Sequence, residues 1–164
     1  HSTSRRQRQM CIRDSAYVVN ELAISVTAFR YREISGSLTE LQTIEALPEK
    51  ERKLPSSAAE IYIHPSGRFL YASVRNDDTI AVFQVDPDSG KLKLLEREPI
   101  RGSHPRSFNL DPSGKWLLAA GRDSNTVSVF RIDQKTGRLT YNNQVVNSPS
   151  PICIAFQQTR LKLQ

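Results

Sequence analysis

The feature that most constrains the fold of this chain is an internal repeat. The stretch "HPSGRFLYASVRNDDTIAVFQVDPDSGKL" (residues 64–92) matches "DPSGKWLLAAGRDSNTVSVFRIDQKTGRL" (residues 111–139) without a gap, at an offset of 47. An earlier copy, "YVVNELAISVTAFRYREISGSL" (residues 17–38), stands 54 residues before the middle one. A register that holds over such lengths is typical of one structural unit used several times along a chain.

Each copy has the pattern of four short strands separated by turns. In the last copy the predicted strands cover residues 106–111, 116–121, 126–133 and 139–146. The third alternates apolar and polar residues, and Pro-Ser-Gly and Thr-Gly stretches favour tight turns. No amphipathic helical periodicity is evident. Four antiparallel strands in a unit of about 40 to 50 residues are typical of a β-propeller blade, so the sequence predicts an all-β propeller.

The length predicts an incomplete propeller. Blades are expected at about 16–58, 59–104 and 105–150, the first without its opening strand, followed by a final strand over 151–156. Propellers close with about 4 to 8 blades, so at most three blades cannot close a ring. We therefore expect residues 16–164 to be a propeller fragment, or one part of a ring made from several chains. As given, the chain is expected to be inactive and poorly stable, because unpaired strand edges invite aggregation.

Residues 1–15 do not fit the repeat. This basic, patternless stretch stands where an opening strand is expected, and it lacks the apolar core and the cleavage site of a secretory signal. A mitochondrial presequence fits its composition. However, one reading frame of the transposon adapter AGATGTGTATAAGAGACAG also encodes "MCIRDS". Our hypothesis is that residues 1–15 are a non-native leader translated from such an adapter.

Charge and cysteine content exclude several classes of function. The net charge is +6, but the excess of basic residues lies in 1–15 and 160–164, so the body is nearly neutral and lacks the footprint of a nucleic-acid binder. No apolar run approaches the roughly 18 residues of a membrane helix. Cys11 and Cys153 show neither metal-ligand nor disulfide spacing, which favours a cytoplasmic protein, and Cys153 is expected to be buried. We expect no metal, cofactor, nucleic acid or membrane partner.

Five residues are predicted to gather at one rim of the propeller. If the four strands of a blade, A to D, run outward from the channel, the start of A and the end of B meet, because they form a hairpin. Glu21, Arg75 and Arg122 end the B strands, Arg106 begins an A strand, and His104 precedes it. A carboxylate among guanidinium groups can form an anion-binding cup with a candidate base.

Structural alternatives stay open at each of these positions. Arg122 can be a solvated turn residue, and Glu21 with Arg75 can be an ion pair between blades. His104 can lie in a flexible loop without a functional role. His64 precedes a turn at the opposite rim, where a structural role is favoured.

The motifs resemble a known family. The segments "YVVNEL", "AAEIYIHPSGRFLYASVRNDDTIAVF", "HPRSFNLDPSGKWLLAAGRDSNTVSVFRID" and "PICIAF", within about residues 16–156, are similar to the C-terminal part of seven-bladed propeller lactonases. That family includes bacterial 6-phosphogluconolactonases and fungal carboxymuconate lactonizing enzymes. The Glu of its Asn-Glu-Leu element falls on Glu21, the Arg that ends the next B strand on Arg75, and the Arg of Pro-Arg-x-Phe on Arg106.

The resemblance implies roles for these residues. Glu21 is expected to act as acid or base together with Arg75 as the catalytic pair, and Arg75 and Arg106 to hold substrate oxygens. His104 and Arg122 are expected to bind substrate because of their predicted place at the rim, not because of the resemblance. A carboxylate with guanidinium donors can activate water and stabilise an oxyanion without a metal. The implied reaction is hydrolysis of 6-phosphogluconolactone to 6-phosphogluconate, in the pentose phosphate pathway.

Alternatives remain, and the sequence departs from the family pattern. A carboxymuconate-type cycloisomerase is the close alternative. A non-catalytic scaffold for protein interactions is another, although the Trp-Asp and Gly-His signatures of WD repeats are missing. Position 74 is Val where the family commonly has Asn, and Gly121-Arg122 replaces an Asn-Gln-like pair. The Gly-Pro-Arg-His element expected before "YVVNEL" is absent, and with it an Arg and a His of the family's site.

Overall fold

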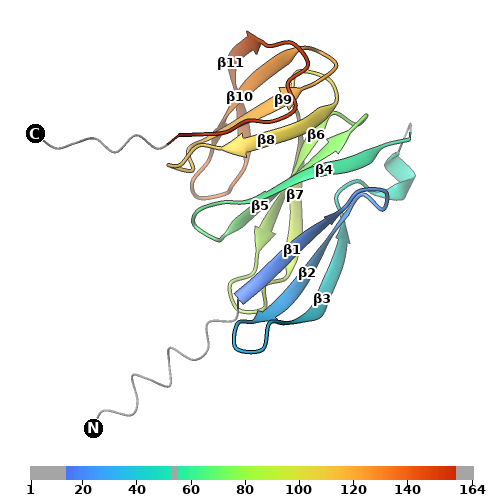
Figure 1. The fold of residues 1–164 in the computed structure, drawn as a ribbon, viewed down its shortest axis with the longest axis vertical. Coiled ribbons are helices and arrows are strands. Elements are labelled where there is room, and N and C mark those ends of the chain that lie inside the picture. Colours follow the sequence, from blue (N-terminus) through green and yellow to red (C-terminus); the bar gives the residue numbers. More distant parts are fainter. Residues whose placement is uncertain (1–13, 53–54, 158–164) are drawn as a thin grey trace, which may run out of the picture.

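The structure consists of three antiparallel sheets. It is a computed structural model, and it describes residues 14–52 and 55–157. The first sheet contains three strands and the others four each (Figure 1). The strands are β1 (Asp14–Asn20), β2 (Ser25–Arg32) and β3 (Ser37–Glu45); β4 (Ser57–Ile63), β5 (Phe69–Arg75), β6 (Thr79–Val85) and β7 (Leu92–Pro99); β8 (Pro105–Leu110), β9 (Trp116–Gly121), β10 (Thr126–Ile132) and β11 (Leu139–Asn147). A 3₁₀ turn, Glu49–Glu51, is the sole helical element in the described part.

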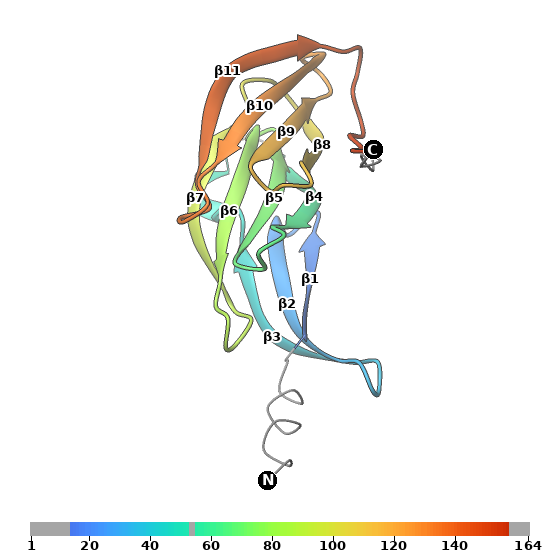
Figure 2. The same ribbon diagram turned by 90° about the vertical axis from the view of Figure 1, so that its left-hand side faces the viewer.

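The sheets follow one another in chain order, with β4–β7 in the middle. In each sheet the strands are paired in the order of the chain. Figure 2 shows the inner strands β1, β4 and β8 on one side and the outer strands β3, β7 and β11 on the other. This is the arrangement of successive propeller blades, so the predicted fold class is confirmed. Among the described residues the first sheet has three strands, whereas the other two sheets have four each.

The core lies in two layers between the sheets. All seven residues of β5 are buried, and alternate side chains point to opposite faces of the sheet. Leu70, Ala72 and Val74 therefore join the cluster shared with the first sheet. Phe69 and Tyr71 join the cluster shared with the third. Burying a large apolar side chain contributes about 1.5–3 kcal/mol, so these two layers hold the sheets together.

Hydrogen bonds at equivalent repeat positions tie neighbouring sheets together. The Tyr17 hydroxyl donates to the carbonyl of Gly90 (2.9 Å), and the Tyr71 hydroxyl donates to that of Gly137 (2.8 Å). Tyr17 and Tyr71 are separated by the offset of 54 between the first two copies, and Gly90 and Gly137 by the offset of 47 between the last two. Each glycine lies in the turn between the last two strands of the next sheet, so the same contact is used at both junctions.

Outer strands are joined in a similarly repeated way. Leu92 N donates to Oε1 of Gln42 (2.7 Å), and the Gln42 amide donates back to the Leu92 carbonyl (3.0 Å). At the next junction Leu139 N donates to Oε1 of Glu96 (2.8 Å). The repeat therefore preserves contacts between blades as well as strands within them.

A backbone latch closes each sheet. The turn that precedes its last two strands contains a residue with left-handed φ: Ile24 (50°) between β1 and β2, Asp78 (55°) between β5 and β6, and Asn125 (55°) between β9 and β10. The carbonyl of that residue accepts a hydrogen bond from the chain as it leaves the last strand. The three bonds are Ala46 N to Ile24 O (2.8 Å), Ile100 N to Asp78 O (2.9 Å) and Ser148 N to Asn125 O (2.9 Å).

Two expectations for the C-terminal part are wrong. Residues 151–156 were expected to form a strand, yet they form none. A strand needs a ladder of backbone partners, and within the described part of the chain this segment instead receives a side-chain bond, from Asn109 Nδ2 to Ile154 O (2.9 Å). Cys153, expected to be buried, is consequently exposed and is a free thiol.

The N-terminal hypothesis falls largely outside the described residues. Residues 1–13 of the predicted leader are not described, whereas Asp14 and Ser15 lie in β1 and pair with Tyr31 and Arg30. In the described part no helix is long and apolar enough to cross a membrane.

His64 has the structural role that its position favours. Its buried ring is 2.8 Å from the Gly114 carbonyl and 2.8 Å from the Ser66 hydroxyl. It thus joins turns of the second and third sheets.

Candidate active site

Glu21 and Arg75 are brought together, as the repeat register predicts. Glu21 directly follows β1, and Arg75 ends the equivalent strand of the next sheet. Arg75 Nη2 forms an ion pair with Glu21 Oε1 and also donates to the Ala58 carbonyl (3.0 Å). The Arg75 side chain is only 10% exposed, whereas that of Glu21 is 62% exposed. The pair therefore presents a carboxylate to solvent from a buried guanidinium.

Arg75 has one polar atom that the fold leaves without a partner. Its Nε is buried and makes no hydrogen bond within the described part of the chain. Most buried polar groups are hydrogen-bonded, so an orphan donor indicates strain, an ordered water or a functional role. This N–H is therefore a donor that no group in the described part of the chain satisfies.

The backbone of His104 is fixed by three different elements. His104 lies in the link between β7 and β8, with φ of 58°. Its N–H donates to Oδ1 of Asp78 (2.7 Å) in the turn between β5 and β6. Its carbonyl accepts from Arg106 N (2.7 Å) and from Arg122 N (3.1 Å). The loop around His104 is therefore held in one place, and the predicted alternative of a flexible loop does not describe it.

The ring of His104 is held against a carboxylate. Its Nδ1 lies 3.4 Å from Oδ2 of Asp123, and its side chain is 15% exposed. Its Nε2 is buried and has no hydrogen-bond partner in the described residues. Burial lowers the pKa of His104, and the Arg122 guanidinium lowers it further. The carboxylates of Asp123 and Asp78 oppose this shift, while Arg75 adds to it.

Arg122 is paired with its neighbour in sequence. Its Nε donates to Oδ1 of Asp123 (2.7 Å), and the side chains of Arg122 and Asp123 are 41% and 48% exposed. This hydrogen bond lowers the pKa of Asp123 and raises that of Arg122. Arg122 thus has a turn contact of the kind expected for a solvated residue, and it also adds positive charge beside His104.

Arg106 lies at the rim without joining the Glu21–Arg75 pair. It is the second residue of β8, and its side chain is exposed. Within the described residues its side chain has no hydrogen bond or ion pair. The structure therefore forms two groups, one of Glu21 with Arg75 and one of His104 with Arg122 and Asp123, linked to Arg106 through the backbone of His104.

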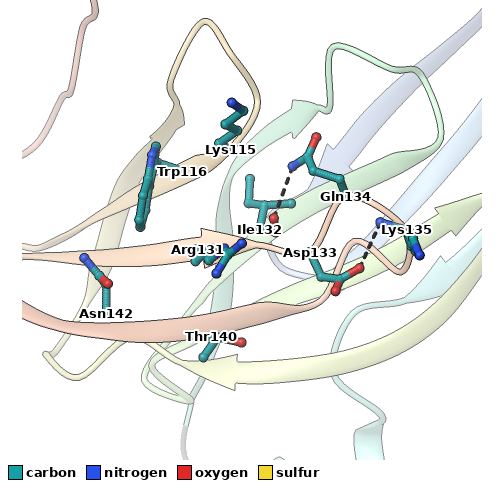
Figure 3. Close-up of a pocket in the computed structure, with 9 residues that line it drawn as sticks. All are labelled: Lys115, Trp116, Arg131, Ile132, Asp133, Gln134, Lys135, Thr140 and Asn142. Carbon is teal, nitrogen blue, oxygen red and sulfur yellow. Dashed lines mark hydrogen bonds between the residues drawn. The ribbon is translucent and has the colours of Figure 1, made fainter.

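The larger of two described surface pockets is elsewhere. Figure 3 shows Lys115 and Trp116 at the start of β9 with Arg131 and Ile132 at the end of β10, the opposite end of the sheet from Arg122. None of the five predicted site residues lines it, and none lines the smaller pocket beside Pro48.

Two carboxylates at the rim were missed by the sequence reasoning. Asp123 contacts both His104 and Arg122, and Asp78 holds the His104 backbone. Both lie in turns that follow B strands, in "RNDD" and "GRDS", beside the predicted Arg75 and Arg122. Their closeness in sequence to Arg75 and Arg122 is the signal that could have identified them as site residues. No group of three His, Cys, Asp or Glu side chains in the described ranges could hold a metal ion.

The sheets, their repeated ties and the charged rim define a β-propeller protein. The chain belongs to the family described as lactonase, 7-bladed beta-propeller, whose family model matches residues 8–156. That match begins within the stretch 1–15 that the sequence predicts to be a leader.

Individual relatives agree with this family. The chain is 36% identical over 141 residues to a 6-phosphogluconolactonase of Bacillus subtilis, covering 86% of this chain and 40% of that protein. It is similar to a periplasmic gluconolactonase of Pseudomonas aeruginosa, with a TM-score of 0.77, 34% identity, and coverage of 84% of this chain and 38% of that one. A Lactobacillus plantarum protein has a TM-score of 0.83 at 28% identity, with coverage of 88% and 42%. The chain therefore spans about two fifths of the length of these relatives.

Proposed function

We propose that this chain supplies part of the active site of a lactonase that hydrolyses 6-phosphogluconolactone to 6-phosphogluconate. The observation that carries the proposal is the pairing of Glu21 with the buried Arg75 at equivalent ends of neighbouring blades. Membership of the lactonase family and similarity to a named 6-phosphogluconolactonase support it.

The residues at the rim match what this reaction requires. Opening a lactone needs a water molecule that loses a proton, donors for the oxyanion, and a proton for the leaving ring oxygen. Arg75 and Arg106 offer donors, and Arg122 adds positive charge for an anionic substrate. Glu21 and His104 are the candidates for proton transfer. A phosphate or carboxylate on the substrate suits guanidinium groups better than a neutral ester does.

We also propose that the reaction takes place in the cytoplasm. It is supported by the absence of a disulfide framework in the sequence, which has two cysteines. The Pseudomonas aeruginosa relative is described as periplasmic, so secretion is the alternative that localisation of the protein would test.

The proposal is tested with a chimera, because the chain alone is expected to be inactive. Residues 14–157 replace the matching segment of the Bacillus subtilis relative, and hydrolysis of 6-phosphogluconolactone is measured. We expect Glu21→Gln and Arg75→Ala each to lower kcat/KM by about 10²–10³-fold. Arg131→Ala and Glu33→Gln are matched controls, since both residues are exposed and lie away from the rim.

The outcomes separate the candidate functions. Unchanged rates for both rim variants would refute the site. Turnover of a carboxymuconate substrate in place of the phosphogluconolactone would favour the cycloisomerase. A folded chimera without activity on either substrate would favour a scaffold.

A further inference from the structure

We propose that His104, positioned by Asp123, is the general base that activates water in the lactonase reaction. This inference rests on the proposed function and sharpens it, because it moves the proton-transfer role from Glu21 to a different residue. The argument depends on how the ring is held, on which ring nitrogen is free, and on what already occupies Glu21.

The position of His104 is determined by the fold. A residue with φ of 58° is outside the usual regions for a non-glycine residue, and such a conformation persists when surrounding contacts enforce it. Here the N–H and the carbonyl of His104 together make three hydrogen bonds, to Asp78, Arg106 and Arg122. These come from the turn after β5, from β8 and from the turn after β9. A base must be held within reach of its proton, and this backbone is held from three sides.

The two ring nitrogens have different surroundings. Nδ1 is 3.4 Å from the Asp123 carboxylate, which favours the tautomer with the proton on Nδ1. Nε2 then carries the lone pair, and it is buried with no protein partner among the described residues. Buried acceptors are hydrogen-bonded to protein groups or to ordered water, and in the proposed mechanism a water molecule fills this role. A water molecule that donates to Nε2 is the nucleophile that lactone hydrolysis requires.

The surrounding charges favour a neutral ring, which is the form that can accept a proton. Burial is the main cause that lowers the pKa of His104, and Arg122 and Arg75 add to it, whereas Asp123 and Asp78 oppose it. The lowered pKa of His104 agrees with the geometric argument. Glu21, by contrast, has Oε1 engaged by Arg75. Its role in this scheme is to orient that guanidinium.

The proposed step balances. Nε2 takes a proton from water as the water oxygen bonds to the lactone carbonyl carbon. The tetrahedral intermediate then breaks its bond to the ring oxygen, which receives the proton from Nε2. The products are a carboxylic acid and a hydroxyl group, with one water consumed and no oxidation or reduction. Arg75 Nε, the other orphan nitrogen at this rim, can donate to the developing oxyanion.

The first test uses the 164-residue chain and does not depend on activity. Nuclear magnetic resonance of ¹⁵N-histidine-labelled protein, with the His104 signals assigned by their loss in His104→Gln, reports the tautomer and the pKa. We expect a neutral ring with the proton on Nδ1. Asp123→Asn should lower the pKa of His104 further and populate both tautomers, whereas Asp133→Asn, an exposed turn residue elsewhere, should change neither. A ring protonated on Nε2 at neutral pH would overturn the inference.

The second test uses the chimera. His104→Gln should lower kcat by about 10²–10⁴-fold and remove the acid limb of the pH profile, as expected for loss of a base. Asp123→Asn should lower kcat and shift that limb, which loss of a merely structural contact would not do. Glu21→Gln should lower kcat but leave the fall in rate at acid pH unchanged. If Glu21 and Arg75 variants lose activity while His104→Gln keeps the parent rate and profile, the inference fails and the proposed function stands. If the chimera hydrolyses no lactone, the proposed function fails.

Discussion

At the scale of single residues, Arg75 serves both the fold and the rim. Its guanidinium donates to the Ala58 carbonyl and pairs with Glu21, while its Nε is buried and unpaired within the described chain. Because Glu21 is largely exposed, the pair contributes less to stability than a buried pair would. Losing Arg75 would leave the Ala58 carbonyl without this donor, at a cost of about 1–3 kcal/mol. Loss of Arg75 should therefore destabilise the fold more than loss of Glu21, although the two residues occupy equivalent positions in the repeat.

The lowered pKa of His104 predicts how the stability of the fold changes with pH. Its pKa is below the ordinary value of 6.5 in the folded chain, so near that pH the unfolded state binds more protons. Stability should therefore be lost as the pH falls below 6.5, until the folded pKa is passed. We expect His104→Gln to show a smaller drop in Tm between about pH 7 and about pH 5 than the parent chain. Thermal unfolding by circular dichroism measures this, and an equal drop in both proteins would contradict it.

Aspartates with lowered pKa values affect stability at a lower pH than His104 does. The pKa values of Asp86, Asp111 and Asp133 lie below 3.8 because of hydrogen bonds within their turns. Their contribution is complete above that value and is lost in stronger acid. They therefore do not mask the effect of His104.

At the scale of elements, the repeated tyrosine contacts predict a graded effect of losing a hydroxyl group. Tyr71 is fully buried, so Tyr71→Phe should leave the Gly137 carbonyl unsatisfied and cost about 1–3 kcal/mol. Tyr17 is only partly buried, and Tyr17→Phe should cost about 0.5–1.5 kcal/mol. Urea unfolding of the two variants measures the difference. Equal losses would contradict the argument from burial.

The turn between β10 and β11 predicts a steric effect that a matched glycine isolates. Gly137 and Gly67 have nearly the same φ, 74° and 70°, so alanine strains the backbone at both positions. A methyl group on Gly137 would collide with the Phe69 ring, whereas a methyl group on Gly67 meets nothing. We expect Gly67→Ala to cost about 1 kcal/mol and Gly137→Ala about 1–3 kcal/mol more. Chemical unfolding of both variants checks this, and similar losses would refute a clash between the sheets.

The elements were predictable because the repeat specifies the strands and turns together. The predicted strands 116–121 and 126–133 correspond closely to β9 and β10, and the shared offset predicted that Glu21 and Arg75 would be neighbours. The contacts of Asp123 with His104 and Arg122 were not predictable in the same way, since a turn carboxylate is usually solvated. The strand expected at 151–156 is absent because an apolar, strand-like run shows that a segment can pair, but not that a partner lies beside it.

At the scale of the whole molecule, the middle sheet should be the most protected. Sheet β4–β7 packs on both faces, and β5 is buried throughout, whereas β3 and β11 are mostly exposed. Opening of local structure is easiest where few buried contacts exist. We expect amide hydrogen exchange to be slowest in β5 and β6 and fastest in β3 and β11. Equal protection of β11 and β5 would contradict this order.

The hydrogen-bonded latch of each sheet has a consequence for how such a protein can be rearranged. Since the carbonyl of Asp78 holds Ile100 as the chain leaves β7, and its carboxylate holds His104 ahead of β8, one turn receives both the outgoing chain and the start of the next blade. Asn125 does the same for Ser148 and Ser150. At the β5–β6 turn, the end of one blade and the chain that leads into the next are thus held at one corner. A genetic engineer could duplicate, delete or exchange a blade as a cassette there without lengthening any connection.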